Sequence, residues 1–203
     1  WYNRWGATDE EVSMSMPGDE LIPGGGSVTR AIGIEAPAAD VWPWLVQMGW
    51  GRGGWYTARW IDRLLFPANG PSTDRVIPEL QDIDIGTFIP DGPPHTECGL
   101  IVEQIEPERA LVLRSNSHLP TSWRAHATLD WSWVFVLTPL DDGRRTRFHF
   151  RSRWTTDPWW LTLVGRMGIV PADFVMSRDM LRGVRTRAER ERPRRAPADA
   201  PVR

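Results

Sequence analysis

The sequence predicts an α+β fold in which antiparallel strands fill the middle of the chain and a long helix closes it. Two observations predict this order. Apolar and polar residues alternate from Thr128 to Thr138, as in a half-buried strand, and Asp141-Asp142-Gly143 follows as a strong hairpin signal. From Pro171 to about Arg190, apolar residues recur instead at helical spacing. The chain therefore pairs a sheet with one long C-terminal helix.

The composition is that of an ordinary globular domain. The chain has 203 residues, of which 41% are hydrophobic and 25% charged, and its net charge is -2. This length favours one domain, which we expect at residues 28–191, after an N-terminal arm (1–27) and before a disordered tail rich in Arg, Pro and Ala (192–203). The small net charge gives no field that would attract nucleic acid, so we expect no nucleic-acid partner.

The predicted cellular location depends on features that are absent from the sequence. No run of about 18 apolar residues occurs, so we expect no membrane span and a cytoplasmic location. Cys98 is the single cysteine, which excludes an intrachain disulfide. Because the chain starts at Trp1 rather than Met, an anchor upstream stays open as an alternative. The sequence leaves the oligomeric state open.

The first part of the chain carries three element signals. Thr8 and Glu11 have the spacing of a capping box, which predicts a helix start within the arm. Residues Val28 to Glu35 alternate as a first strand. Two short helices should follow, one from near Asp40 and capped by Gly49, the other from about Tyr56 to Phe66.

The strands after these helices are bounded by turn residues. Short strands are expected at 85–90, 100–105 and 110–114, before the long strand at 128–138. The strand that returns after the hairpin should place Thr146, Phe148, Phe150, Ser152 and Trp154 on one face. Its other face carries Arg145, Arg147, His149, Arg151 and Arg153, and we expect that face to be solvated.

Three short segments of the sequence carry a resemblance to a known superfamily. They are Thr29-Arg30-Ala31-Ile32 leading to Ala36-Pro37-Ala38-Ala39-Asp40-Val41-Trp42, then Asp84-Ile85-Gly86-Thr87, then Met180-Leu181-Arg182-Gly183-Val184. With the order of elements, they resemble the START-like superfamily, also called SRPBCC, which includes START lipid-transfer domains, polyketide cyclases and aromatases, and major pollen allergens. The segments 4–11 and 49–56 look like an uncharacterised bacterial subgroup of it.

The resemblance covers about residues 28–190 and implies a helix-grip fold. In that fold a curved antiparallel sheet wraps the long helix over a hydrophobic tunnel. The superfamily contains carriers, sensors and enzymes without one shared catalytic motif, so the resemblance assigns no catalytic residue here. It implies only which parts of the chain form the walls of the tunnel.

The candidate site consists of the residues expected to line that tunnel. The chain has 13 tryptophans against 2 tyrosines and 6 phenylalanines, which suits an aromatic-lined cavity as well as a plain core. The candidates are Trp44, Gln47, Met48, Arg52, Trp55, Tyr56, Trp60, Trp131, Trp133, Phe148, Phe150, Trp154, Phe174, Met180 and Leu181. Arg52 or Tyr56 should meet an anionic or carbonyl head of the ligand.

The sequence favours a binding function over catalysis. We expect a carrier or sensor of an apolar small molecule such as a lipid, polyketide or terpenoid. The alternatives are an enzyme acting on such a molecule and a structural or partner-docking domain whose core is filled by its own side chains. Residues 49–54 match G-x-G-x-x-G, but they follow a helix outside any βαβ unit, and the His and Cys residues are scattered. We therefore expect no cofactor and no metal.

Overall fold

The computed structural model describes residues 2–65, 67–165, 167 and 170–191 of the chain. Six strands form one antiparallel sheet in the order β1-β6-β5-β4-β3-β2. The strands are β1 (Gly26–Ile34), β2 (Phe88–Pro90), β3 (Gly99–Glu106), β4 (Ala110–Ser115), β5 (Thr128–Leu140) and β6 (Arg145–Asp157). The predicted tail at 192–203 lies outside the described residues.

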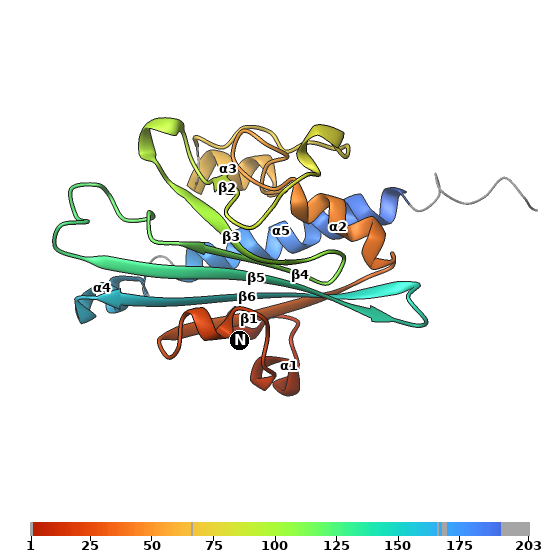
Figure 1. Cartoon of the computed structure of the whole chain (residues 1–203), viewed down its shortest axis with the longest axis horizontal. Helices are drawn as coiled ribbons and strands as arrows, with labels where there is room; N and C mark the ends of the chain where they lie inside the picture. Colours follow the sequence, from red (N-terminus) through yellow and green to blue (C-terminus); the bar gives the residue numbers. More distant parts are fainter. Residues whose placement is uncertain (1, 66, 166, 168–169, 192–203) are drawn as a thin grey trace, which may run out of the picture.

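The helices lie on both sides of this sheet. They are α1 (Asp9–Ser13), α2 (Ala38–Val46), α3 (Arg59–Leu65), α4 (Trp159–Val164) and α5 (Val170–Glu191), with short 3-10 turns at Tyr2–Arg4, Asp19–Leu21, Pro78–Leu80 and Pro94–Thr96. Figure 1 shows α2, α3 and α5 on one side of the sheet and α1 on the other. The curved antiparallel sheet with its long C-terminal helix confirms the predicted α+β, helix-grip architecture.

The pairing of β5 with β6 fixes which side chains face α5. Phe135 lies opposite Phe150, and Trp133 lies opposite Ser152. Trp133, Phe148 and Phe150 are fully buried, so the predicted inward face is confirmed. The hairpin between the strands turns through Asp141, Asp142 and Gly143, which have positive φ angles of 51°, 56° and 81°. Asp and Gly tolerate this conformation better than other residues do.

The two helices after β1 depart from the prediction in detail. The C-cap of α2 is Gln47 rather than Gly49, and Pro43 lies inside the helix. The second helix, α3, begins at Arg59 rather than near Tyr56. Only one side of this short helix meets the protein: Ile61 is buried, while Trp60 is 64% exposed. Placing Trp60 in the interior was therefore wrong, because Ile61 and Asp62 form the buried side of α3.

The expectation that the alternate residues of β6 are solvated was also wrong. The arm, residues 2–25, lies across that face, and His149 and Arg151 are only 3% and 2% exposed. All five N–H groups of Arg151 are used. They donate to Thr29 Oγ1, to the carbonyls of Glu11, Val12 and Met14, and to Asp19 Oδ2. A row of basic side chains thus binds the arm instead of water.

Glu11 is the arm's main anionic contact with β6. Its carboxylate accepts two hydrogen bonds from Arg147, at 2.7 and 2.8 Å, and lies 3.0 Å from His149 Nε2. It also completes the predicted capping box with Thr8, which is confirmed. Chiefly because of Arg147, the pKa of Glu11 falls to about 2. The resulting stabilisation is present above the ordinary carboxylate pKa and is lost as pH falls towards 2.

No helix within the described residues combines the length and the apolar character that crossing a bilayer requires.

Candidate ligand-binding site

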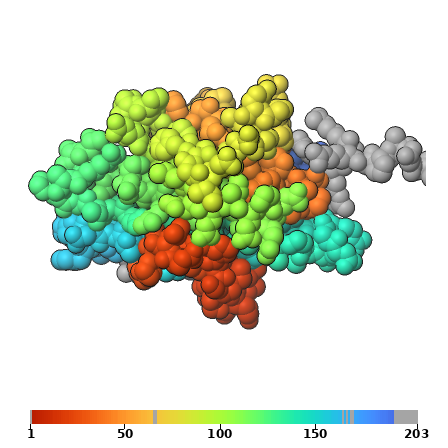
Figure 2. Space-filling model, viewed as in Figure 1, coloured from red at the N-terminus to blue at the C-terminus, as the bar shows by residue number. Residues whose placement is uncertain are grey.

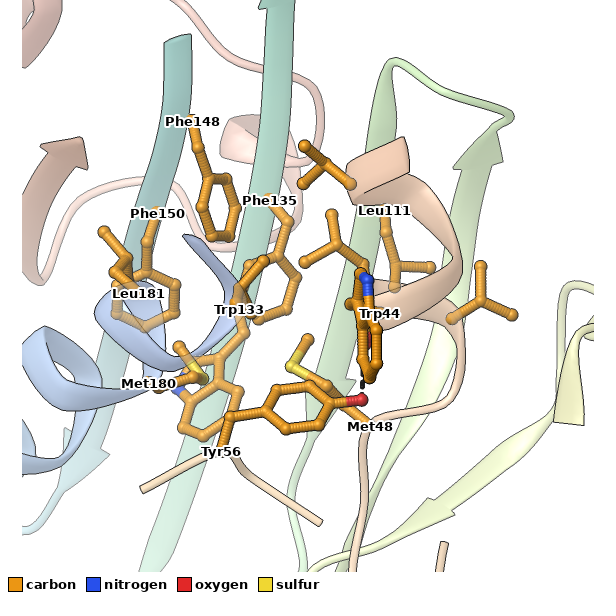
Figure 3. Close-up of a cluster of buried hydrophobic side chains, with 14 of the residues drawn as sticks. Trp44, Met48, Tyr56, Leu111, Trp133, Phe135, Phe148, Phe150, Met180 and Leu181 are labelled. Atoms are coloured by element: carbon orange, nitrogen blue, oxygen red, sulfur yellow. Dashed lines mark hydrogen bonds between the residues drawn. The ribbon is translucent and has the colours of Figure 1, made fainter. Parts of the chain in front are cut away.

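An aromatic cluster fills the space between the inner face of the sheet and helices α2 and α5. Trp133 lies at its centre (Figure 3). The ring of Trp133 meets Trp55 at 5.3 Å, Trp131 at 5.0 Å, Phe150 at 5.5 Å and Phe135 at 6.2 Å, each edge to face. Edge-to-face pairs at these distances add stabilisation beyond the burial of area. The cluster is therefore closely packed around one indole.

Tyr56 connects α2 and α5 across this cluster. Its ring meets Trp44 at 5.9 Å, and its hydroxyl donates to the Trp44 carbonyl at 2.9 Å. On its other side α5 approaches so closely that a Cβ at Gly183 would lie 2.1 Å from the Tyr56 carbonyl oxygen. Burial raises the pKa of Tyr56 far above its ordinary value, so the phenol stays neutral. Tyr56 is thus a hydrogen-bonded wall residue without a charge to offer.

Three indole N–H groups in the cluster have no acceptor. The Nε1 atoms of Trp44, Trp55 and Trp133 are buried and make no hydrogen bond to the described residues. By contrast, Trp131 Nε1 donates to Ser152 Oγ at 2.6 Å. A buried donor without a partner costs about 1–3 kcal/mol, and folded proteins rarely keep several in one place. These three donors mark the cluster as a place where acceptor atoms are missing.

The predicted site residues fall into two groups. Those buried together in the cluster are Trp44, Met48, Trp55, Tyr56, Trp133, Phe148, Phe150, Met180 and Leu181, with Trp131 packed against it. The others lie elsewhere. Gln47 accepts from Ile77 N and donates to the Arg75 carbonyl. Trp154 is half-buried beside Gly26, and Phe174 is half-buried beneath Arg30.

A small hollow lies outside the cluster, at the glycine-rich loop. Its volume is about 140 Å³, and it is lined by Trp50, Gly51, Arg52, Gly54, Trp55, Asp62, Asn69, Gly70 and Pro71. Pockets that enclose drug-sized ligands measure roughly 300–1,000 Å³, so this hollow holds only part of such a molecule. Trp55 lines the hollow and also contacts Trp133. Its indole is therefore the wall between the hollow and the cluster.

Arg52 serves first as a cap for α2. Its Nε donates to the Met48 carbonyl at 3.0 Å, and its Nη2 donates to the Val46 carbonyl at 3.1 Å. Helix C-termini leave carbonyls unpaired, and an arginine just beyond the helix end can satisfy them. Burial lowers the pKa of Arg52. Only part of its guanidinium is left to meet a ligand in the hollow.

A polar cluster that the sequence did not reveal borders Trp131. His118 Nε2 lies 2.9 Å from Asp91 Oδ2, and His118 Nδ1 lies 2.7 Å from Ser115 Oγ. The imidazole meets the Trp131 ring edge to face at 4.7 Å. These residues come from three separate segments, and no local spacing signals their meeting. A serine in contact with a histidine that in turn contacts an aspartate resembles the arrangement of an activated serine nucleophile. Whether Ser115 is activated depends on the protonation state of His118.

His118 is protonated at neutral pH. Burial lowers its pKa, but the hydrogen bond to Asp91 and the nearby Cys98 side chain outweigh burial and raise the pKa to about 9. Both ring nitrogens then donate, to Ser115 and to Asp91. An imidazolium cannot accept the proton of Ser115 Oγ, so the group is not an activated serine at neutral pH.

The raised pKa of His118 beside Asp91 makes the free energy of unfolding depend on pH. Because the folded-state pKa of His118 is raised, its contribution is complete below pH 6.5 and disappears as pH rises through about 9. At about 1.4 kcal/mol per pKa unit, the loss is on the order of 3 kcal/mol. Urea denaturation at pH 6, 8 and 10 should show this loss in the native chain, and Asp91→Asn should remove most of it. Equal pH slopes in both proteins would contradict the assignment.

The described residues contain no group of three or more His, Cys, Asp or Glu side chains placed to hold a metal ion.

Comparisons with known proteins identify similar folds only. No family model matches the chain, and no curated protein matches it in sequence. A hypothetical protein from Helicobacter pylori is 13% identical and has a TM-score of 0.49, with 87% of this chain and 96% of that chain covered. A Polyketide_cyc-like protein from Corynebacterium glutamicum is 15% identical, with a TM-score of 0.45 and coverage of 86% and 98%.

A protein from Mesorhizobium loti is 17% identical, with a TM-score of 0.44 and coverage of 81% and 98%. Since these TM-scores lie below 0.5, the function is inferred from this chain's own residues.

Proposed function

We propose that the chain binds an apolar small molecule with oxygen acceptors, of the lipid, polyketide or terpenoid class, inside the aromatic cluster. It would act as a carrier or sensor of the START-like kind. The observation that carries this proposal is the set of three buried indole N–H groups, on Trp44, Trp55 and Trp133, that find no acceptor in the part of the chain that the structure describes. A carbonyl or ether oxygen on the ligand would accept a hydrogen bond from one of them.

The energetics favour a ligand with oxygen over a pure hydrocarbon. Each indole N–H loses its bond to water when the protein folds, and a hydrocarbon would restore none of them. One ligand oxygen recovers a hydrogen bond worth about 0.5–1.5 kcal/mol net, and the aromatic walls add stacking. The specificity of the site therefore resides in its donors, while its affinity comes mostly from apolar burial.

The proposal also includes a route into the cluster. Trp55 separates the hollow at the glycine loop from Trp133, so an outward turn of the Trp55 indole would open the hollow towards Trp133. The backbone beside it is suited to movement, since Gly51 and Gly54 have positive φ angles of 70° and 82° and Gly51 has no atom near its Cβ position. Trp55 is the gate in this scheme.

An enzyme is the second candidate, and the His118 cluster favours it. The imidazolium of His118 touches Trp131, whose ring in turn contacts Trp133. A proton donor therefore stands at one border of the aromatic cluster and would suit acid-catalysed dehydration or cyclisation of a bound ligand. Mass spectrometry of a ligand incubated with the protein would distinguish the two functions, since a carrier returns it unchanged.

The test uses two probes of one shape. 9-Fluorenone has a carbonyl oxygen, and fluorene is the corresponding hydrocarbon. Titration followed by tryptophan fluorescence should show fluorenone binding up to about tenfold more tightly than fluorene. Native mass spectrometry of the purified protein should in addition reveal any ligand carried through purification.

A matched pair of variants locates the site. Trp133→Phe keeps an aromatic ring but removes the N–H, and it should reduce the preference for fluorenone. Trp159→Phe changes a side chain that is 76% exposed and should leave the preference intact. If neither probe binds, the core is a filled one and the chain is structural. If both probes bind equally well to the native protein, the indole donors play no part.

A further inference from the structure

A second hollow lies on the opposite face of the sheet from the aromatic cluster. Its volume is about 480 Å³, and it opens between the arm and strands β1 and β6. The lining residues are Asn3, Arg4, Val12, Ser13, Met14, Ser15 and Asp19 from the arm, and Ser27, Thr29, Arg151 and Arg153 from the sheet. Figure 1 shows the arm on that side, and Figure 2 shows it as the red surface beneath the sheet.

The charges around this hollow are mostly positive. Arg4, Arg151 and Arg153 line it, and Asp19 is the one acidic residue among its lining residues. Arg151 is fully occupied by the arm and by Thr29 of β1, so it contributes charge without free donors. The other two arginines are available in part. Arg153 donates to the carbonyls of Ile22 and Gly24, but its Nη1 is 3.6 Å from Asp19 Oδ1, too far for a hydrogen bond. Arg4 pairs with the exposed Asp9.

The rest of the lining is also suited to oxygen ligands. Ser13, Ser15, Ser27 and Thr29 bring four hydroxyl groups to a hollow whose only large apolar lining residues are Val12 and Met14. Hydroxyl and guanidinium donors together are the usual partners of phosphate and carboxylate oxygens. The volume falls within the roughly 300–1,000 Å³ of small-molecule pockets, so the hollow admits more than a single ion.

We propose that this hollow is a binding site for a small molecule bearing an oxyanion of at least two negative charges, a phosphate or polycarboxylate group, held between Arg4 and Arg153. The site is independent of the aromatic cluster, because Thr29, Arg151 and Arg153 point to the outer face while their neighbours Phe150 and Ser152 point inward. The ligand proposed for this hollow is polar, whereas the ligand proposed for the aromatic cluster is apolar.

Binding there would also join the arm to the sheet. Arg4 belongs to the first turn of the arm, and Arg153 belongs to β6. An anion that accepts from both arginines adds a bridge beside the contacts of Arg151 and Arg147. The ligand would therefore protect the arm from proteolysis, and this readout does not depend on any activity of the protein.

The test uses sodium pyrophosphate and citrate in a phosphate-free, low-salt buffer. Isothermal titration should show that at least one of the two binds, more weakly as sodium chloride is raised, and limited proteolysis of the arm should slow in its presence. Stronger binding of pyrophosphate would identify phosphate compounds as the ligand class, and stronger binding of citrate would identify polycarboxylates.

Variants distinguish a specific anion-binding site from nonspecific electrostatic attraction. Arg4→Gln and Arg153→Gln should each weaken binding by about tenfold, whereas Arg109→Gln should have no effect. Arg109 is an exposed arginine on the β3–β4 turn with a weak ion pair to Glu106. Arg4→Gln also avoids a folding problem, since Arg4 pairs within the arm. Absence of binding by both anions, or equal loss in the Arg109 variant, would overturn the proposal.

Discussion

Replacing Arg151 by Met should lower the free energy of unfolding by about 3–5 kcal/mol, the cost typical of removing one partner of a buried ion pair. Arg151 is 2% exposed, and its guanidinium satisfies three carbonyls of the arm, Asp19 and Thr29 at once. Met fills a similar volume but offers no hydrogen-bond donor to any of these acceptors. Urea denaturation followed by circular dichroism would measure the loss.

A matched variant separates this effect from the general loss of an arginine. Arg144→Met removes an exposed arginine in the β5–β6 hairpin, whose Nε donates only to the Asp141 carbonyl. Its stability should stay within about 0.5 kcal/mol of the native value, as for most surface changes. Proteolysis should also cut the arm faster in the Arg151 variant. A loss under about 1 kcal/mol for Arg151→Met would show that the arm contributes little to stability.

Replacing Trp133 by Ala should lower the free energy of unfolding by a similar amount, about 3–5 kcal/mol. Trp133 is fully buried and contacts four other aromatic rings, so its removal leaves a cavity that its neighbours cannot close by small shifts. Thermal and urea denaturation would both register the change. The expected loss is reduced by the relief of one unpaired buried indole N–H.

Trp159→Ala is the control for this substitution. Trp159 is 76% exposed at the start of α4, so its loss should change stability by less than about 0.5 kcal/mol. A ligand that fills the cavity of Trp133→Ala should restore part of the stability, and an apolar probe such as naphthalene would test this. Equal effects of the two substitutions would mean that the aromatic cluster is not the centre of the core.

The sequence predicted what local periodicity can encode. Two-residue alternation along β5 and β6 identified Trp133, Phe148 and Phe150 as inward, and helical spacing identified Leu181 on α5. The same alternation placed Arg151 on the opposite face correctly. It could not show that the arm covers that face, because a row of arginines has the same spacing whether its partners are water or carbonyls.

The parts of the site that escaped prediction depend on long-range contacts. Asp91, Ser115 and His118 meet only after β2, β3 and β4 have paired. Trp60 was misplaced for the opposite reason: a seven-residue helix is too short for its spacing to show which side is buried. The three unpaired indole donors are equally invisible in the sequence, since any tryptophan carries one.

The contacts of the arm impose an order on folding during synthesis. Glu11 is bound by Arg147, which lies 136 residues later in the chain. At translation rates of about 5–20 residues per second, the ribosome needs on the order of 10 seconds to make the intervening segment. For that interval Glu11 is present without the arginine that binds it. The arm is thus made well before the strand that holds it, and until β6 has been made it is exposed to chaperones and proteases.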